Sequence, residues 1–441
     1  MRSYQVLIFI ACVMACLAAL CMVLPGHVAW GEKELRWPTF AEVFERTDHS
    51  ADIVQDIDLP EIPEEAPEET VTDTIVPEKP KPVIPKVVVD STTDSRIFLK
   101  SFYASLAEAG EHVVRVLHYG DSQIEEDRMS QQIREALQKR YGGSGAGLMP
   151  LAQTIPSRTV RQELLMNGRM VTPQQGPRRY FVYGLRRDQR RDGRYGVMGQ
   201  VAMMNDSLVS GSEEITAICT PQDNGPRYTT WRVFADSSIH YTFTGDTVQL
   251  NGSGAVYGLS QESETGVIVD NIPMRGSLGL VFTKMDSMQL ATFYREENVK
   301  LIIMQFGGNA IPSNETPGTI QSIVKGLRQQ VRCLRALAPE ASILFIGPSD
   351  MLTQIDGEWQ TYPMIPYMDQ LLRKMALEEE IAYFSLFRWM GGAGSMAHWQ
   401  EVGLAGSDGI HFMRSGARKA GRAVAEWMMD SDELKVKSEE K

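Results

Sequence analysis

The chain has 441 residues, of which 44 are Lys or Arg and 56 are Asp or Glu, so its formal net charge is −12. This length allows two or three domains, and a hydrophobic fraction of 43% with 23% charged residues is ordinary for a globular protein. Composition therefore excludes a disordered chain, a collagen-like chain and a membrane protein with many spans. The acidic balance also argues against nucleic acid as a partner of the whole protein.

Most of the negative charge lies in one segment. Residues 51–80 contain ten acidic side chains, one Lys and five Pro, which gives them a charge of −9. Residues 81–430 sum to −1, so the part of the chain that can fold is nearly neutral. Because the acidic segment lacks apolar periodicity, we interpret residues 31–92 as an extended, acidic, Pro-rich linker.

An uncharged apolar run at residues 6–24 precedes the linker. As a helix, this run would be about 28 Å long, close to the roughly 30 Å hydrocarbon core of a bilayer. We therefore expect residues 1–30 to be a membrane anchor. A cleaved signal peptide is the main alternative, and lipid attachment at Cys16 is a weaker one because the residues before it match a lipobox poorly. All three interpretations place the rest of the chain in the periplasm or another extracytoplasmic space, tethered to the inner membrane if the anchor is kept.

The number and placement of the Cys residues are compatible with an exported protein but do not test that interpretation. Cys219 and Cys333 are the two Cys residues after the apolar run. They could pair in an oxidising compartment, but two buried free thiols are at least as good an interpretation. The sequence has no CxxC pair and no His/Cys cluster with zinc spacing, so we expect no metal and no cofactor.

Apolar strands alternate with helical patterns in two parts of the chain. Residues 113–118 form the first apolar run, which stops at Gly120-Asp121-Ser122. Further apolar runs lie at 267–271, 301–306, 343–346 and 381–386, and helical patterns at 93–110, 128–141, 284–297, 317–337, 364–379 and 415–429. Such alternation indicates a parallel sheet covered by helices on both faces. Ligands in these folds bind at the carboxyl ends of the strands.

Short alternating runs separated by Asp, Asn, Gly and Ser turns interrupt this pattern from about residue 155 to 262. They predict an all-β insertion, a sandwich of roughly 100 residues. The expected domains are the two α/β parts at 93–154 and 265–430, the β insertion at 155–264 and a charged tail at 431–441.

Residues 178–194 of the insertion contain seven Arg and two Asp. We interpret this run first as a solvated loop with internal ion pairs. Contact with an anionic polymer is the functional alternative, because clustered Arg side chains favour bidentate binding of oxyanions.

Ser122 is the first candidate for chemistry. It lies where a predicted strand turns into a helix, which exposes the hydroxyl and directs a helix N-terminus at a bound group. The same position suits a helix N-cap, and the GxSxG motif of α/β-hydrolases is absent because residue 124 is Ile.

A nucleophilic Ser needs a base, and the pKa of His suits that role near neutral pH. His411 follows a Gly-rich loop, with Asp408 three residues upstream. This spacing lets the carboxylate hold the imidazole tautomer that accepts the Ser proton. An Asp turn followed by a helix-capping His is the structural alternative.

Acyl transfer also needs hydrogen-bond donors for the developing oxyanion. Asn309 follows the predicted strand at 301–306, and Gly276 follows the one at 267–271, so both are expected at the sheet edge that carries Ser122. The alternative for each is a loop residue that tolerates an unusual backbone conformation.

These motifs occur in the order of the four blocks of the SGNH, or GDSL, hydrolases, which the chain resembles over residues 93–150 and 265–430. The resemblance implies a three-layer α/β/α, flavodoxin-like fold. It also implies Ser122 as nucleophile, His411 as base and Asp408 as the residue that orients it. The implied oxyanion donors are the Ser122 and Gly276 N–H groups and the Asn309 side chain. Gln123 and Ala310 depart from the usual pattern and leave the substrate preference open.

The inserted β region and the Gly-rich segments at 142–150 and 390–399 are similar to those of bacterial peptidoglycan O-acetylesterases. In that branch the insertion resembles a carbohydrate-binding jelly roll. Gln123, Trp389 and Trp399 are the candidate substrate-binding residues. The two Trp side chains could stack on sugar rings or could equally be core aromatics.

The leading hypothesis is an envelope serine esterase that removes O-acetyl groups from a glycan, with peptidoglycan as the expected substrate and no nucleic acid partner. A close alternative is an O-acetyltransferase that uses the same residues. The third is a non-catalytic glycan-binding protein, against which the intact set of motifs argues.

Overall fold

The computed structural model describes residues 27–30, 33–36, 85, 87, 93–150, 157–166, 169–171, 181–183, 200–204, 215–221, 230–235, 237–244, 247–252 and 254–430. The chain divides into two units, Met1–Lys79 and Pro80–Lys441. In the first unit, β1 (His27–Trp30) and β2 (Lys33–Arg36) form an antiparallel hairpin.

The expected membrane anchor and the acidic segment at 51–80 lie outside the described residues. In the part of the chain that the structure describes, no helix has both the length and the apolar character needed to cross a membrane.

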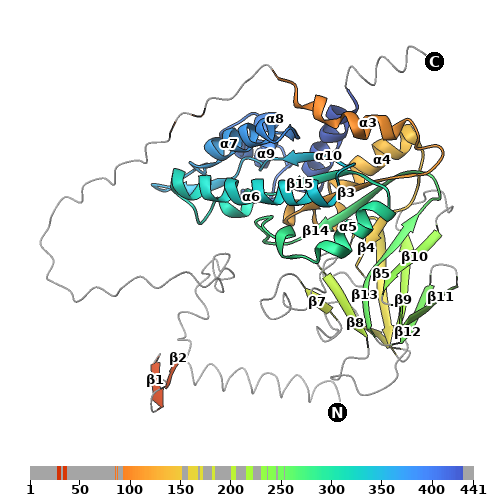
Figure 1. Ribbon diagram of the computed structural model, residues 1–441. Coiled ribbons are helices and arrows are strands. Elements are labelled where there is room, and N and C mark those ends of the chain that lie inside the picture. The colour runs from red at the N-terminus through yellow and green to blue at the C-terminus, as the bar shows by residue number, and fades with distance from the viewer. Residues whose placement is uncertain are drawn as a thin grey trace, which may run out of the picture. The chain divides into compact units, whose positions relative to one another are not determined.

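A five-stranded parallel sheet forms the centre of the second unit (Figure 1). Its strands, in spatial order, are β14 (Gly266–Pro273), β3 (Val113–Gly120), β15 (Val299–Gln305), β16 (Ser342–Ile346) and β19 (Ala382–Phe384). Numbered along the chain, this order is 2-1-3-4-5, which is the flavodoxin-like arrangement. The parallel sheet that the sequence predicts is confirmed.

Successive side chains of each strand enter two different cores. In β3, Val114 and Val116 join one buried cluster while Leu117 and Tyr119 join the other. The first cluster contains side chains from α3 (Lys100–Leu106), α4 (Ser130–Tyr141), α9 (Ser395–Glu401) and α10 (Arg414–Met429). The second contains side chains from α5 (Ser287–Glu296), α6 (Pro317–Leu337) and α7 (Ile365–Glu378). Helices therefore cover both faces of the sheet, as expected for three layers (Figure 1).

Antiparallel strands occupy the region between the two α/β parts. One sheet has the order β10-β13-β8-β7, with β4 paired to β13, and the other has the order β11-β12-β9-β5-β6. The bounds are β4 (Gly147–Met149), β5 (Val160–Met166), β6 (Arg169–Val171), β7 (Phe181–Tyr183), β8 (Gln200–Met204), β9 (Ile215–Pro221), β10 (Thr230–Ala235), β11 (Ile239–Thr244), β12 (Thr247–Gly252) and β13 (Gly254–Glu262). Buried residues of both sheets, among them Leu250 and Leu259, share one cluster. The two sheets thus face each other across a common core, as in a sandwich. Of the Arg-rich run at 178–194, the described residues include only the backbone of β7.

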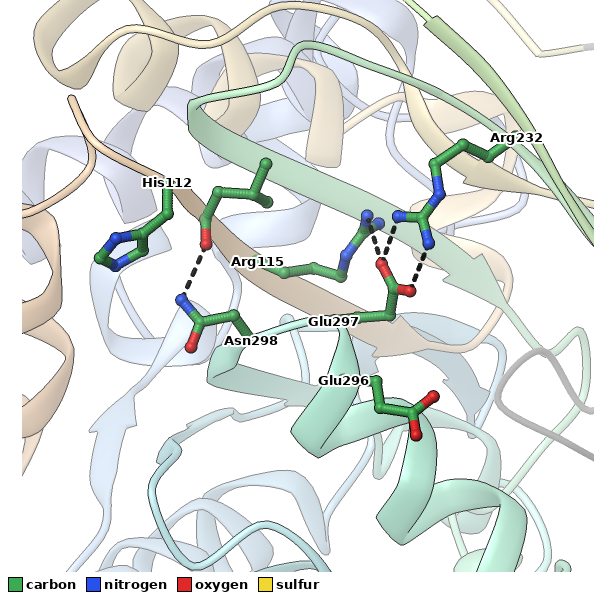
Figure 2. A pocket seen from close by; sticks show the side chains of 7 residues that line it. His112, Arg115, Arg232, Glu296, Glu297 and Asn298 are labelled. Carbon is green, nitrogen blue, oxygen red and sulfur yellow. Dashed lines mark hydrogen bonds and ion pairs between the residues drawn. The ribbon is translucent and has the colours of Figure 1, made fainter.

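A buried ionic cluster joins the β strands of the insertion to the parallel sheet. Arg115 of β3 is fully buried and bonds to Asp270 of β14 at 3.0 and 3.1 Å, to Glu297 at 3.2 Å and to Glu262 of β13. Arg232 of β10 reaches Glu262 at 2.5 Å and Glu297 at 2.6 and 2.7 Å. Figure 2 shows Glu297 between the two guanidinium groups, in the lining of a pocket of about 410 Å³.

Candidate active site

Ser122 lies directly beyond the carboxyl end of β3, in the 3₁₀ helix η3 (Ser122–Asp127). Its hydroxyl oxygen is 2.9 Å from Nε2 of His411. Nδ1 of His411 is 2.7 Å from Oδ2 of Asp408. The fold therefore brings together three residues that the sequence separates by up to 289 positions, in the order expected for a nucleophile, a base and its orienting carboxylate.

The loop between α9 and α10 fixes the geometry of His411 and Asp408. Oδ1 of Asp408 accepts hydrogen bonds of 3.0 Å from the backbone N–H groups of Ile410 and His411. Gly406 N–H closes the loop by donating to the His411 carbonyl at 2.8 Å. Burial tends to raise the pKa of Asp408, but these bonds and the His411 ring outweigh it and lower the pKa to about 2. Asp408 is therefore ionised at neutral pH and can accept a hydrogen bond from the Nδ1–H group of His411.

Asn309 lies in the short 3₁₀ helix η6 (Gly308–Ala310), which follows β15. Its Nδ2 group donates to Oδ2 of Asp121 and to the Ser277 carbonyl, each at 3.2 Å. Asn309 thus lies beside the residue that precedes Ser122. Because both bonds are long, an oxyanion at Ser122 could compete for the amide hydrogens.

Gly276 belongs to the loop after β14, next to the carbonyl that Asn309 contacts. Its backbone φ is +70°, and a Cβ added there would meet no atom within 4 Å. Glycine is therefore favoured by the left-handed backbone and not by lack of space. The structure places the loops that carry Gly276 and Asn309 side by side, as the sequence predicts.

Asp121 is a residue of the candidate site that the sequence motifs did not single out. It is 5% exposed, and its carboxylate accepts the Gln123 N–H at 2.9 Å as well as the Asn309 amide. Burial raises its pKa to about 6. Asp121 therefore connects the Ser122 turn to the candidate oxyanion donor. An Asp directly before the candidate nucleophile was the available sequence signal.

Gln123 contacts the loop that carries His411. Its side chain is turned toward this loop, where Nε2 donates to the Ile410 carbonyl at 2.7 Å. Its Oε1 atom is buried without a hydrogen-bond partner. With 9% of its surface exposed, Gln123 is placed to hold the residue before His411, and direct substrate binding by Gln123 stays a prediction.

Trp399 is a core aromatic residue, and Trp389 packs against the same core while only partly buried. Trp399 is 4% exposed, and its ring centroid lies 5.0 Å from that of Phe412 and 5.5 Å from that of Trp389. Trp389 also contacts Phe384, at 6.3 Å between centroids. A sugar ring cannot reach the face of the buried Trp399 indole, so the structure favours the core alternative for Trp399, whereas sugar stacking by Trp389 stays a prediction.

Two further links join the Ser122 turn to its surroundings. Glu125 accepts from Nε and Nη2 of Arg275 at 2.7 and 2.6 Å, and Arg275 directly precedes Gly276.

The backbone after Glu125 is left-handed at two residues. Glu126 and Asp127 have φ values of 61° and 62°, which cost about 1–2 kcal/mol each. Asp127 is held by Arg134, with contacts of 2.5 and 3.1 Å. The segment after Ser122 is therefore fixed by ion pairs, which a helical pattern in the sequence does not reveal.

A buried polar chain lies within the sheet beneath the site. His118 of β3 contacts Gln305 through Nε2 at 3.1 Å and Ser130 through Nδ1 at 2.8 Å. The Ser130 hydroxyl oxygen also lies 2.8 Å from Oδ1 of Asn271. Burial lowers the pKa of His118 to about 4. His118 is thus neutral at physiological pH and connects β3 to β14, β15 and α4.

Cys333 carries a free thiol, whose pKa is raised by burial. Among the described side chains, no three of His, Cys, Asp or Glu are grouped as a metal site requires.

Comparisons with known proteins identify the fold. No protein-family model and no curated protein sequence matches the chain. A solved structure of a peptidoglycan O-acetylesterase matches 76% of this chain and 95% of its own, with 19% identity and a TM-score of 0.59. An acetyl xylan esterase matches 37% of this chain and 79% of its own, with 15% identity and a TM-score of 0.26. An acetyl-xylooligosaccharide esterase of Geobacillus matches 38% and 75%, with 16% identity and a TM-score of 0.25.

The first of these matches covers more of the chain than its two α/β parts, which make up about half of the sequence, so the likeness extends beyond them. The resemblance expected from the sequence motifs is confirmed at the level of the fold: this chain shares the fold of that peptidoglycan O-acetylesterase structure.

Proposed function

We propose that this chain is a serine esterase of the SGNH type that removes O-acetyl groups from a cell-envelope glycan. The observation that carries the proposal is the contact of Ser122 Oγ with His411 Nε2 at 2.9 Å, continued by His411 Nδ1 to Asp408 at 2.7 Å. A purely structural Ser and His would not need this order of contacts together with two candidate oxyanion loops at the same sheet edge.

The reaction follows from these positions. Oγ of Ser122 attacks the acetyl carbonyl carbon while its proton passes to Nε2 of His411, and Asp408 stabilises the imidazolium that forms. The N–H groups of Ser122 and Gly276 and the amide of Asn309 stabilise the carbonyl oxygen, which becomes an oxyanion. The C–O bond to the sugar then breaks, and the sugar oxygen takes the proton from His411. Water attacks the acetyl-Ser122 intermediate with His411 as base, and acetate leaves as the Ser122 hydroxyl re-forms.

Peptidoglycan is the substrate that we propose. The support is the shared fold with a peptidoglycan O-acetylesterase over 76% of the chain, together with the antiparallel sheets between the two α/β parts. We further propose that residues 1–30 anchor the enzyme and that the acidic linker holds it away from the membrane, where it would act on the wall. An O-acetyltransferase differs only in the acceptor, since a sugar hydroxyl takes the place of water at the acetyl-enzyme.

The test is acetate release by the full chain from O-acetylated peptidoglycan and from acetylated xylan. Ser122→Ala is expected to abolish release, and Ser322→Ala, which removes a hydroxyl bonded only within α6, is a matched control that should retain it. Equal rates for the wild type and Ser122→Ala would refute the esterase. Acetylated sugar in place of free acetate would identify a transferase. Faster release of acetate from acetylated xylan than from peptidoglycan would identify xylan, and not peptidoglycan, as the substrate.

A further inference from the structure

A short hairpin projects from the loop that follows β16. It consists of β17 (Leu352–Ile355) and β18 (Glu358–Thr361), joined by Asp356 and Gly357. The φ values of these two turn residues are 55° and 83°, as in the two-residue Asp-Gly turns that match the twist of paired strands. The turn therefore gives the hairpin a defined shape.

The base of this hairpin is attached to the catalytic loop. The Leu352 N–H donates to the carbonyl of Gly409, which lies between Asp408 and His411, at 2.9 Å. A Cβ at Gly409 would come within 3.0 Å of Cβ of Leu352, so the two backbones are in close contact. The hairpin thus has a fixed position relative to His411.

The other strand of the hairpin is fixed as well. Thr361 donates its hydroxyl to the buried Asp350 at 2.8 Å and accepts the Gly394 N–H at 2.7 Å. Both strands are therefore held at their base, and the hairpin cannot swing without breaking these hydrogen bonds.

The register places Trp359 on the face that meets the catalytic loop. Leu352 pairs with Thr361, and Gln354 pairs with Trp359, two residues further along each strand. Residues two apart and residues directly opposite each other project from the same face of an antiparallel pair. Trp359 is therefore on the face of Leu352, about 7 Å farther from the catalytic loop along the strand.

Trp359 is 57% exposed, whereas Trp399 is in the core. A large exposed indole beside a catalytic loop offers a flat apolar surface, and Gln354 opposite it carries an amide that can bond to hydroxyl groups. Pyranose rings have this combination of an apolar C–H face and hydroxyl edges.

We infer that Trp359 is a sugar-stacking residue that binds a pyranose ring of the glycan chain next to the acetylated sugar. The inference rests on the proposed function and adds a subsite to it. Unlike the buried Trp399, Trp359 offers an indole that solvent can reach.

The kinetic test compares two substrates for each variant. Relative to the wild type, Trp359→Ala is expected to lower the ratio of kcat/KM on acetylated glycan to kcat/KM on p-nitrophenyl acetate about tenfold, mainly through KM on the glycan. Trp359→Phe should recover most of the ratio because it keeps a flat ring. Met288→Ala on α5 removes another exposed apolar side chain and should leave the ratio unchanged. An unchanged ratio in Trp359→Ala, or equal losses on both substrates, would overturn the inference.

A binding test separates this inference from the proposed function. In the Ser122→Ala background, Trp359→Ala should weaken binding of non-hydrolysed O-acetylated peptidoglycan or acetylated xylan about tenfold. Weaker binding of one polymer identifies the glycan, and weaker binding of both identifies the pyranose face as the feature recognised. Unchanged Kd values for both polymers would overturn the subsite even if the wild type is an active esterase, whereas a wild type without esterase activity would refute only the proposed reaction.

Discussion

Gln123 joins the turn that carries Ser122 to the loop that carries His411, through one hydrogen bond from its side-chain amide to the Ile410 carbonyl. The Oε1 atom of Gln123 is buried without a hydrogen-bond partner. The free-energy cost of burying this atom offsets part of the stabilisation that the bond to Ile410 provides. Gln123→Leu removes the bond and the unpaired oxygen together. We therefore expect the free energy of unfolding to change by less than about 1 kcal/mol.

Activity should respond more strongly than stability to Gln123→Leu. Because Gln123 acts on the position of His411, kcat is expected to fall about tenfold while KM stays within twofold. Steady-state kinetics on acetylated glycan, with urea unfolding of the same protein, measures both quantities. A raised KM with unchanged kcat would instead show that Gln123 contacts the substrate, as the sequence had suggested.

At the scale of elements, β3 and the turn that follows it carry two buried groups, His118 and Asp121, whose titrations oppose each other. The folded protein holds the pKa of His118 at about 4, below its ordinary 6.5, so stability is lost as pH falls from 6.5 to 4. It holds the pKa of Asp121 at about 6, above its ordinary 3.8, so stability is gained as pH falls from 6 to 3.8. Each shift corresponds to about 3 kcal/mol, so the two nearly cancel.

Replacing one of the two groups should expose the effect of the other. Between pH 6.5 and 4, His118→Gln is expected to gain about 3 kcal/mol of unfolding free energy relative to the wild type, and Asp121→Asn to lose about as much. Urea unfolding at both pH values measures the change for each protein, so effects of the substitution that do not depend on pH cancel. Parallel behaviour of both variants and the wild type would contradict the shifted pKa values.

The same strand shows what the sequence could predict. An apolar run ending at Gly120 is enough to predict β3 and to place Ser122 at its carboxyl end, because burial on both faces leaves a continuous apolar signal. The Asp121–Asn309 contact and the Gln123–Ile410 contact are between segments far apart in the chain, and no local pattern encodes them. The hairpin that carries Trp359 was missed because its strands of four residues are too short for a periodic pattern.

Aromatic residues show the same limit. The sequence left Trp399 open between sugar stacking and the core, whereas the structure shows that residues 395–401 form α9 and turn the indole into the core. Periodicity over seven residues does not reveal which face of a helix meets its neighbours. The sequence thus predicted that the fold brings Ser122 and His411 together better than it predicted the surroundings of the aromatic residues.

At the scale of the whole molecule, the Arg115 cluster joins the parallel sheet to the β strands of the insertion. Arg115 and Arg232 share Glu262 and Glu297, Arg115 also pairs with Asp270, and Arg115 is fully buried. Loss of the Arg115 charge would leave three carboxylates with one cation. Removing one partner of a buried ion pair typically costs about 3–5 kcal/mol, because the remaining charge is left buried and uncompensated.

Arg115→Met keeps much of the side-chain volume and removes the charge, so we expect it to lower the free energy of unfolding by about 3–5 kcal/mol. Arg232→Met is the matched control and should cost less, since the Arg232 side chain is 43% exposed and water can replace part of its contacts. Urea unfolding followed by far-UV circular dichroism and Trp fluorescence measures the loss. Because the cluster contains residues from both sheets, the two signals of Arg115→Met should shift together. A loss below about 1 kcal/mol, or a shift in only one signal, would show that the cluster does not couple the insertion to the parallel sheet.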